Sequence, residues 1–222
     1  MGKNLEHQFS MLVREIRKEY IQESLDEKHM HTSAIQQFQV WWNEALKSEI
    51  QEPNAMTLAT ASADGLPSAR IVLLKDFDEK GFVFYTNYNS FKGQQLAENP
   101  RACLVFFWKE LERQVRITGV TTKVSAIESD EYFNIRPEGS RIGAIASPQS
   151  QVISNREWLE SEVKQLQNKF SSDAIKRPEH WGGYRLMPAI IEFWQGRPNR
   201  LHDRLQYTLQ EDASWKIERL AP

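Results

Sequence analysis

Near the C-terminus, three side chains that can carry positive charge occupy every second position: Arg200, His202 and Arg204. Alternate side chains of an extended segment project from one face. If residues 200–204 are extended, that face holds two guanidinium groups and an imidazole, which repel one another in water. The spacing therefore favours an electron-rich ligand lying against them. The alternative is a structural or solvated histidine between ordinary surface arginines.

A second segment has the residue types of a phosphate site. Polar Tyr85-Thr86-Asn87 closes a predicted strand and leads into Ser90-Phe91-Lys92-Gly93, the predicted start of a helix. Backbone N–H groups at a helix N-terminus, together with a lysine, bind phosphate readily. A capped helix with an exposed lysine would explain the same residues.

A third segment also fits a phosphate group. Tyr132 and Arg136 are four residues apart and share a face of a predicted helix, which Pro137 ends. Ser140 follows near the start of the next helix. Phenol, guanidinium and hydroxyl groups in this arrangement can hold a phosphate monoester. An exposed arginine and a helix-capping serine remain the simpler explanation.

Two predicted strands carry polar groups of interest. The apolar run of residues 71–74 lies between Arg70 and Lys75, and buried cations need an anionic partner. In the predicted strand over 112–125, the side chains of Gln114 and Val115 lie on opposite faces. The Gln114 amide can both donate to and accept from the edge of a heteroaromatic ring. Ordinary surface charges and a polar outer face are the alternatives.

These residues need elements to position them. Hydrophobic spacing predicts helices over 5–20, 33–50 with Ser33 as the N-cap, 90–99, and 126–170 with breaks near Pro137 and Pro148. Strands are predicted over 55–62, 67–77, 82–87, 101–108, 112–125, 184–187, 190–195, 203–209 and 215–220. Consecutive strands joined by tight turns predict an antiparallel barrel with helices outside, in the α+β class.

The bulk properties narrow the function. The 222 residues carry a net charge of -2, so a general nucleic-acid binder is disfavoured and any anion site must be built from locally gathered cations. We expect no metal site. The single Cys103, expected to be buried, fits a reducing compartment. The sequence has no signal core and no apolar run long enough to span a bilayer, so we expect a cytoplasmic protein.

Taken together, the segments resemble the pyridoxine (pyridoxamine) 5'-phosphate oxidase family from about Arg17 to Pro222. Matching segments, in order and spacing, are residues 70–75, 81–87, 112–115, 149–150, 191–196, 200–204 and 215–222. The resemblance implies a homodimeric split β-barrel with flavin mononucleotide (FMN) at the subunit interface. It also implies oxidation of pyridoxine or pyridoxamine 5'-phosphate to pyridoxal 5'-phosphate by oxygen, which gives hydrogen peroxide.

The resemblance also assigns roles to residues. The flavin would be held by Arg70, Ile71, Val72, Leu73, Leu74, Lys75, Tyr85, Thr86, Lys92, Gln114, Gln149, Ser150, Trp194 and Arg204. The substrate would contact Arg17, Tyr20, Lys75, Tyr132, Arg136, Ser140, Arg200 and His202, of which Arg200 and His202 would be catalytic. Residues 1–30 would form a helical segment folding over the occupied site, and residues 31–222 a single domain.

One position departs from the family pattern, and two other functions stay open. The family usually has arginine immediately before the lysine of the flavin-phosphate motif, where this chain has Phe91. One alternative function is a related flavin oxidase of phenazine biosynthesis, which would not need the substrate-phosphate residues. The other is a non-enzymatic carrier of flavin or pyridoxal phosphate, which would bind without turnover.

Overall fold

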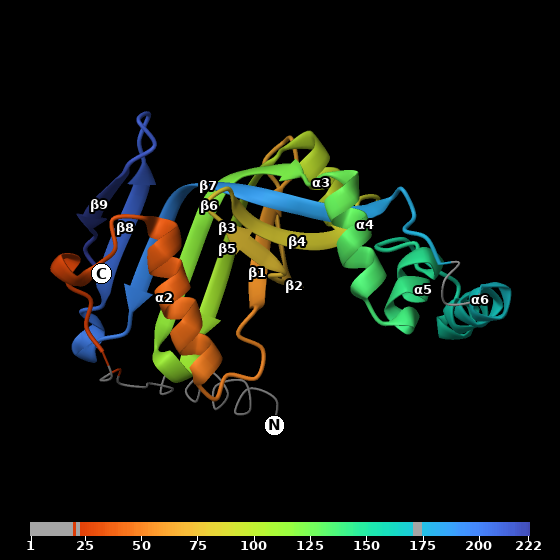
Figure 1. Cartoon of the computed structure of the whole chain (residues 1–222), viewed down its shortest axis with the longest axis horizontal. Helices are drawn as coiled ribbons and strands as arrows, with labels where there is room; N and C mark the ends of the chain where they lie inside the picture. Colours follow the sequence, from red (N-terminus) through yellow and green to blue (C-terminus); the bar gives the residue numbers. More distant parts are fainter. Residues whose placement is uncertain (1–19, 21–22, 171–174) are drawn as a thin grey trace, which may run out of the picture.

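The computed structural model describes residues 20, 23–170 and 175–222, in which nine antiparallel strands form one curled sheet (Figure 1). Its order is β2-β1-β5-β6-β7-β4-β3, and β8 and β9 extend it beyond β7. The strands are β1 (Ala55–Ala61), β2 (Pro67–Leu73), β3 (Asp76–Asp78), β4 (Gly81–Asn87), β5 (Arg101–Trp108), β6 (Arg113–Lys123), β7 (Trp181–Gln195), β8 (Asp203–Leu209) and β9 (Trp215–Arg219). The predicted antiparallel α+β class is confirmed.

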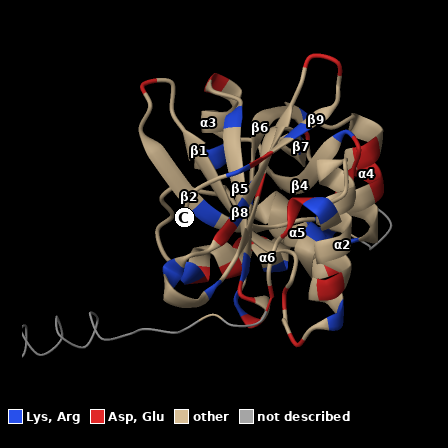
Figure 2. Ribbon diagram, turned by 90° about the vertical axis from the view of Figure 1, so that its left-hand side faces the viewer, with Lys and Arg blue, Asp and Glu red and all other residues tan. Residues whose placement is uncertain are grey.

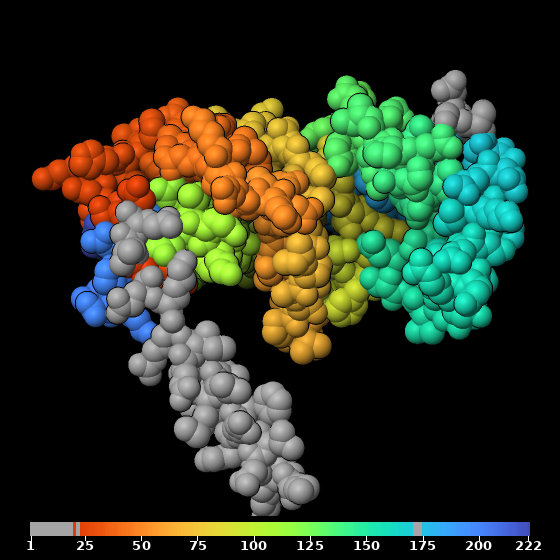
Figure 3. All heavy atoms as spheres, turned by 90° about the horizontal axis from the view of Figure 1, so that it is seen from below, coloured from red at the N-terminus to blue at the C-terminus, as the bar shows by residue number. Residues whose placement is uncertain are grey.

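The helices lie outside the sheet, as expected. They are α2 (Ala34–Lys47), α3 (Phe91–Glu98), α4 (Ala126–Ile135), α5 (Glu138–Ala146) and α6 (Arg156–Lys169), with short 3-10 turns at Glu27–His29, Lys109–Leu111 and Pro198–Arg200. Figure 3 shows α2 (orange) over one part of the molecule and the α4–α6 segment (green to teal) at the other end. None of the helices that the structure describes is long and apolar enough to cross a membrane.

Helix α2 covers the main core. Ser33 caps it as predicted, because the Ser33 hydroxyl accepts a hydrogen bond from the backbone N–H of Gln36. The fully buried ring of Phe38 packs edge-on against Phe82, with the ring centroids 4.9 Å apart. Burying a side chain of this size contributes about 1.5–3 kcal/mol, so α2 is fixed on the sheet mainly by its apolar face.

The strand predicted over residues 67–77 is wrong in one respect, because the structure divides it. β2 pairs with β1, whereas β3 pairs with β4. Between them, the backbone N–H of Leu74 donates to Asn54 and that of Lys75 to Val83. The chain therefore changes hydrogen-bonding partner at these two residues, which places Lys75 at a corner of the curled sheet.

The two strands predicted over 184–187 and 190–195 are instead one strand, β7. Pro188 lies opposite Gly119, where the register between β6 and β7 shifts. Proline has no N–H to donate, so a β-bulge at this point lets the strand continue through it. A Cβ atom at position 119 would lie 1.9 Å from the carbonyl oxygen of Met187, so this close approach requires glycine.

The helical stretch predicted over 126–170 appears as α4, α5 and α6. A second, smaller core of Phe133, Ile142, Ile175 and Trp181 joins α4 and α5 to the start of β7. Cys103, expected to be buried, is only half-buried on β5. The helix predicted over 5–20 lies outside the described residues except for Tyr20, and the domain boundary near residue 30 stays a prediction.

Candidate functional site

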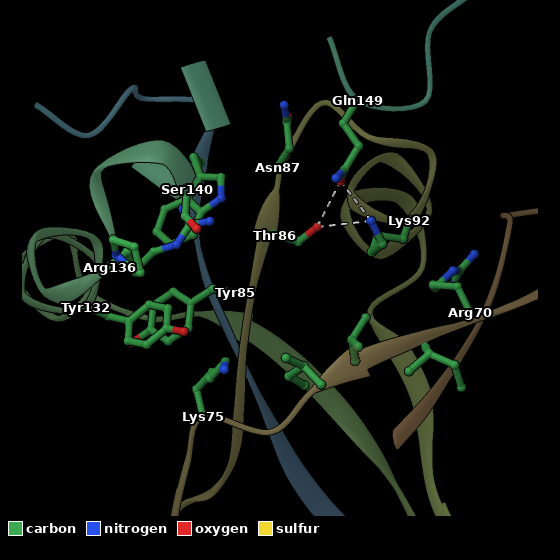
Figure 4. A pocket seen from close by; sticks show the side chains of 15 residues that line it. Arg70, Lys75, Tyr85, Thr86, Asn87, Lys92, Tyr132, Arg136, Ser140 and Gln149 are labelled. Atoms are coloured by element: carbon green, nitrogen blue, oxygen red, sulfur yellow. Dashed lines mark hydrogen bonds between the residues drawn. The ribbon is translucent and has the colours of Figure 1, made fainter. Parts of the chain in front are cut away.

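A cavity of about 510 Å³ opens where β2 and β4 meet the helices α3, α4 and α5 (Figure 4). Of the residues proposed from the sequence, it gathers Arg70, Ile71, Val72, Leu73, Lys75, Tyr85, Thr86, Lys92, Tyr132, Arg136, Ser140 and Gln149. Asn87, Pro137 and Trp181 complete the lining. In Figure 4 the polar side chains form two groups, one around Lys92 and one around Arg136.

The first group surrounds the start of α3. The Ser90 hydroxyl accepts a hydrogen bond from the backbone N–H of Gly93 and so caps the helix. The ammonium of Lys92 donates to Gln149 Oε1 at 2.9 Å and to Thr86 Oγ1 at 3.1 Å. Burial lowers the pKa of Lys92, and the nearby charge of Arg70 lowers it further. Every oxygen that Lys92 contacts among the described residues is neutral, which leaves its charge available to an anion.

Arg70 adds a second cation to this group. Its Nη1 donates to Thr60 Oγ1 at 2.6 Å and to the Leu58 carbonyl at 3.2 Å, which directs the guanidinium along the edge of β1. The Gln95 side-chain oxygen lies 3.5 Å from Nη2. Burial lowers the pKa of Arg70. Two half-buried cations therefore lie in one group although each makes the other less stable.

The second group lies on α4 and α5. The guanidinium of Arg136 stacks over the ring of Trp181, 4.5 Å from its centroid, and its buried Nη1 has no hydrogen-bond partner in the described chain. The rings of Tyr132 and Tyr85 stack with centroids 4.0 Å apart. Burial lowers the pKa of Arg136 and raises that of Tyr85 to about 12. A buried donor without a partner is costly, and an anion in the cavity would satisfy it.

Several arginines elsewhere in the described chain contrast with these cations. Arg113, Arg177, Arg185, Arg204 and Arg219 each form an ion pair with a carboxylate. Within the described residues, the cations of the cavity (Arg70, Lys75, Lys92 and Arg136) have no carboxylate within 4.0 Å. Figure 2 shows basic and acidic residues interspersed over the ribbon. The cavity is therefore a local concentration of unpaired positive charge in a protein of net charge -2.

Several predicted residues lie elsewhere. Leu74 is buried in the main core, and Ser150 follows Gln149 in a left-handed turn (φ 70°) without lining the cavity. Gln114, Trp194, Arg204, Arg200, His202 and Tyr20 belong to the part of the chain around β6, β7 and β8. Figure 1 shows β8 and β9 at one end of the molecule and α4 and α5 at the other. Arg17 lies outside the described residues.

The expectation of an extended segment over 200–204 is wrong. Residues 198–200 form a 3-10 turn in which Asn199 and Arg200 have φ values of 56° and 60°, and β8 begins only at Asp203. The three cationic side chains therefore do not share a strand face. The charge of Arg204 is balanced by a carboxylate, because its Nε donates to Glu192 at 2.8 Å. This hydrogen bond raises the pKa of Arg204.

Sheet pairing nevertheless aligns three of the predicted flavin ligands. Gln114 on β6 is opposite Trp194 on β7, which is in turn opposite Arg204 on β8. Residues opposite each other on neighbouring strands project from the same face. The amide, the indole and the guanidinium thus form one row across three strands, an arrangement that the spacing along the sequence did not reveal.

His202 lies beside this row in a defined protonation state. Its ring is 4.6 Å from that of Trp194, centroid to centroid, and Tyr20 packs edge-on against both. The backbone N–H of Arg197 donates to His202 Nδ1 at 3.1 Å, so Nδ1 carries no proton. Burial and the charge of Arg200 lower the pKa of His202 below 6.5. The imidazole is therefore neutral at pH 7 and carries its proton on Nε2.

Some residues of the cavity escaped the sequence analysis. Trp181 lies under Arg136 but has no neighbour in the sequence that indicates a ligand. Asn87, which ends β4, belongs to the predicted polar segment with Tyr85 and Thr86 but was not assigned a role. Thr60 and Gln95, both buried, hold Arg70 from β1 and α3. Only the pairing of distant strands brings these groups together. A buried glutamine facing a buried threonine could not be found from hydrophobic spacing.

Two family models together match most of the chain. Residues 42–170 match the model described as pyridoxamine 5'-phosphate oxidase, and residues 181–222 match the pyridoxine 5'-phosphate oxidase C-terminal dimerisation region. A curated protein from Trichormus variabilis, named pyridoxine/pyridoxamine 5'-phosphate oxidase, is 58% identical over 210 residues, which are 95% of this chain and 98% of that protein.

Two solved structures are similar as well. PhzG from Burkholderia lata, solved with tetrahydrophenazine-1-carboxylic acid, is 30% identical with a TM-score of 0.84, over 91% of this chain and 99% of that one. An FMN-binding protein from Nostoc punctiforme is 18% identical with a TM-score of 0.69, over 87% of this chain and 100% of that one, a likeness of fold alone. The antiparallel sheet is thus a split barrel, and the chain belongs to the pyridoxamine 5'-phosphate oxidase family.

Proposed function

We propose that this protein oxidises pyridoxine or pyridoxamine 5'-phosphate to pyridoxal 5'-phosphate with FMN as cofactor and oxygen as acceptor. The observation that carries the proposal is the pair of cationic groups in one cavity, Arg70 with Lys92 and Arg136 with Lys75, whose charges no carboxylate of the described chain neutralises. Two such groups suit two phosphate monoesters, one on the cofactor and one on the substrate.

The chemistry of the cavity fits FMN. Lys92, Arg70, Thr86 and Gln149 would hold its phosphate beside the N-terminus of α3, where backbone N–H groups add to the positive field. The run Ile71, Val72 and Leu73 would lie along the flavin, together with Tyr85. Leu74 and Ser150 complete the assigned set, Leu74 through the packing behind the run and Ser150 through the turn that places Gln149.

The second group would hold the substrate phosphate. Arg136 offers a buried guanidinium N–H without a partner, Lys75 lies 5.9 Å from the centre of the Tyr132 ring, and Ser140 adds a hydroxyl on α5. These donors would distinguish phosphorylated from unphosphorylated substrate. Their presence also disfavours the phenazine oxidase, which would not need them.

A second copy of the chain would complete each site. Gln114, Trp194 and Arg204 form a row suited to a flavin ring, but they lie at the end of the molecule away from α4 and α5. Residues 181–222, which match a dimerisation region, contain Trp194, Arg200, His202 and Arg204. We therefore infer a homodimer in which the cavity of one subunit faces the row of the other, with the flavin between them.

Each residue near the substrate then has a defined task. Bound FMN supplies a hydride acceptor that oxygen regenerates, with release of hydrogen peroxide. Arg204 would offset negative charge that develops on the cofactor. His202, neutral with Nδ1 already accepting from Arg197, can donate through Nε2 but can accept no substrate proton at Nδ1. Arg200 would lie over the pyridine ring, and Tyr20, and by resemblance Arg17, would cover it.

Spectroscopy of the purified protein tests the proposal. The protein should be yellow and should bleach without oxygen on addition of pyridoxine 5'-phosphate, but not of unphosphorylated pyridoxine at the same concentration. Equal bleaching by both compounds would contradict the substrate-phosphate group. Binding of pyridoxine 5'-phosphate without bleaching would favour a carrier. A cytoplasmic location is part of the proposal and rests on the single cysteine, which cannot form an intrachain disulfide.

A further inference from the structure

The carboxylate of Glu192 lies beside the predicted flavin ligands, and the reaction as described gives it no role. Glu192 is on β7, opposite Arg116 on β6 and Gln206 on β8. This row is next to that of Gln114, Trp194 and Arg204 and projects from the same face, because the two rows are two residues apart along each strand. Glu192 is therefore the direct neighbour of the proposed flavin ligands.

Glu192 contacts two arginines. Its Oε1 accepts a hydrogen bond from Arg204 Nε at 2.8 Å, and its Oε2 lies 3.3 Å from Arg116 Nη1. The Glu192 side chain is only 4% exposed, whereas those of Arg204 and Arg116 are 26% and 47% exposed. A buried carboxylate is costly unless it is paired, so the two arginines account for its stability but not for its position beside the flavin ligands.

The geometry at Arg204 suggests what the carboxylate does. Nε is held by Glu192, and Nη1 donates to the carbonyl oxygen of Ala221 at 2.8 Å. A guanidinium is planar, so two fixed contacts on different nitrogens define the plane and direction of the whole group. The third nitrogen, Nη2, is then held in a set orientation instead of being free to rotate.

We propose that Glu192 is a positioning residue that orients Arg204 toward the cofactor. The inference rests on the proposed function, because it takes Arg204 to be a flavin ligand. Glu192 itself touches neither substrate nor cofactor in this scheme. It acts by holding the guanidinium in place, with Arg116 as a second counter-ion of the buried carboxylate.

The test measures FMN binding to apoprotein by the quenching of flavin fluorescence, which does not depend on turnover. Glu192→Gln keeps the shape of the side chain and removes its charge. We expect the variant to bind FMN roughly tenfold more weakly, as for the loss of a charge-assisted hydrogen bond. Arg116→Gln is the matched control, because it removes the other partner of the same carboxylate; its FMN affinity should stay within about twofold of wild type.

A double-mutant cycle separates positioning from general stabilisation. In an Arg204→Ala background, Glu192→Gln should have no further effect on FMN affinity, because the group that it orients is gone. The direction in which Glu192→Gln shifts the reduction potential of bound FMN is an independent test. If Arg204 loses its orientation, the potential should fall; if Arg204 stays in place and only a negative charge is lost, it should rise.

The outcomes are distinct. Unchanged FMN affinity in Glu192→Gln with weakened binding in Arg204→Ala would overturn the inference and leave the proposed function intact. Equal weakening in Arg116→Gln and Glu192→Gln, or a raised potential, would also overturn it. Wild-type affinity in Arg204→Ala would instead contradict the assignment of Arg204. If Glu192→Gln does not fold, Arg204→Lys keeps the charge without the planar geometry and should weaken FMN binding similarly; wild-type affinity there would overturn the inference.

Discussion

Lys92 Nζ donates a 2.9 Å hydrogen bond to Gln149 Oε1, joining the first turn of α3 to a loop 57 residues further along the chain. The contact holds a lysine against a neutral amide inside a cavity. Because an amide cannot neutralise an ammonium, the loop shapes the site without competing for the anion. The predictions that follow separate the two cationic groups of the cavity and the residues behind them.

The two groups should be separable by mutation. Arg136→Ala should raise KM for pyridoxine 5'-phosphate roughly 10- to 150-fold, since a charge-assisted hydrogen bond contributes about 1.5–3 kcal/mol. FMN affinity should stay as in wild type. Lys92→Ala should do the reverse, weakening FMN and sparing KM in FMN-saturated protein. Loss of flavin from Arg136→Ala would show that the two phosphates are assigned the wrong way round.

Thr60 should affect FMN through Arg70. Thr60→Val keeps the side-chain shape but removes the acceptor 2.6 Å from Arg70 Nη1, so FMN should bind roughly 2- to 12-fold more weakly. Thr121→Val is the matched control: Thr121 is equally buried and donates to the Pro100 carbonyl outside the cavity. FMN titration and thermal melts of both apoproteins decide the point. If Thr60→Val and Thr121→Val bind FMN equally well and lose the same melting temperature, Thr60 has only a structural role.

Phe91 should be replaceable by arginine. Its side chain is 49% exposed at the first position of α3, beside Lys92, and it belongs to neither hydrophobic core. Phe91→Arg should therefore tighten FMN binding by about 1 kcal/mol, as for a partly solvated ion pair, at little cost in stability. A lower melting temperature of the apoprotein without tighter binding would show that Phe91 packs against something that the single chain does not present.

His202 should make stability depend on pH. Its pKa in the folded protein is lowered below 6.5, so the folded state binds fewer protons than the unfolded state in this range. The stabilisation is complete above the unfolded pKa and is lost as pH falls through the folded one. Unfolding by denaturant between about pH 5 and 8 should therefore show wild type losing stability toward acid relative to His202→Gln. Parallel curves would contradict a neutral His202.

Replacing Arg200 should depress turnover as well as substrate binding, because we place it over the reacting ring. His202→Gln should lower kcat less, since an amide N–H can stand in for the Nε2 donor. Steady-state kinetics with FMN-saturated protein measures both variants. Wild-type kcat in Arg200→Ala would refute the placement of Arg200.

Local patterns predicted much of this molecule. Ser33 caps a helix where the sequence indicated, and Tyr132, Arg136 and Ser140 meet in the cavity because helix periodicity and Pro137 fix their spacing. The failures share a physical cause. The break after Leu73 depends on which distant strands offer hydrogen bonds. The extended conformation considered for residues 200–204 is prevented by the left-handed backbone of Asn199 and Arg200, and the arginine side chain gives no sign of it.

Resemblance also supplied what periodicity could not. Nothing in the local sequence shows that Gln114, Trp194 and Arg204 lie opposite one another, because they come from three strands. Glu192 was invisible for a related reason. A glutamate within an apolar strand shows only that it needs partners, and Arg116 and Arg204 are identified by sheet register.

The unbroken strand β7 has a consequence for how activity is shared between subunits. It carries Trp181, under Arg136, near one end and Trp194, beside His202, at the other, roughly 40 Å apart if the strand is fully extended. Because β7 is continuous, the cavity and the row of Gln114, Trp194 and Arg204 of one chain stay too far apart to bind the same flavin. This arrangement predicts complementation between subunits. In a mixed dimer of an Arg136→Ala subunit and an Arg204→Ala subunit, one site would contain both substitutions and the other site would contain neither. At low substrate and FMN concentrations, two impaired preparations should therefore regain activity when their subunits exchange.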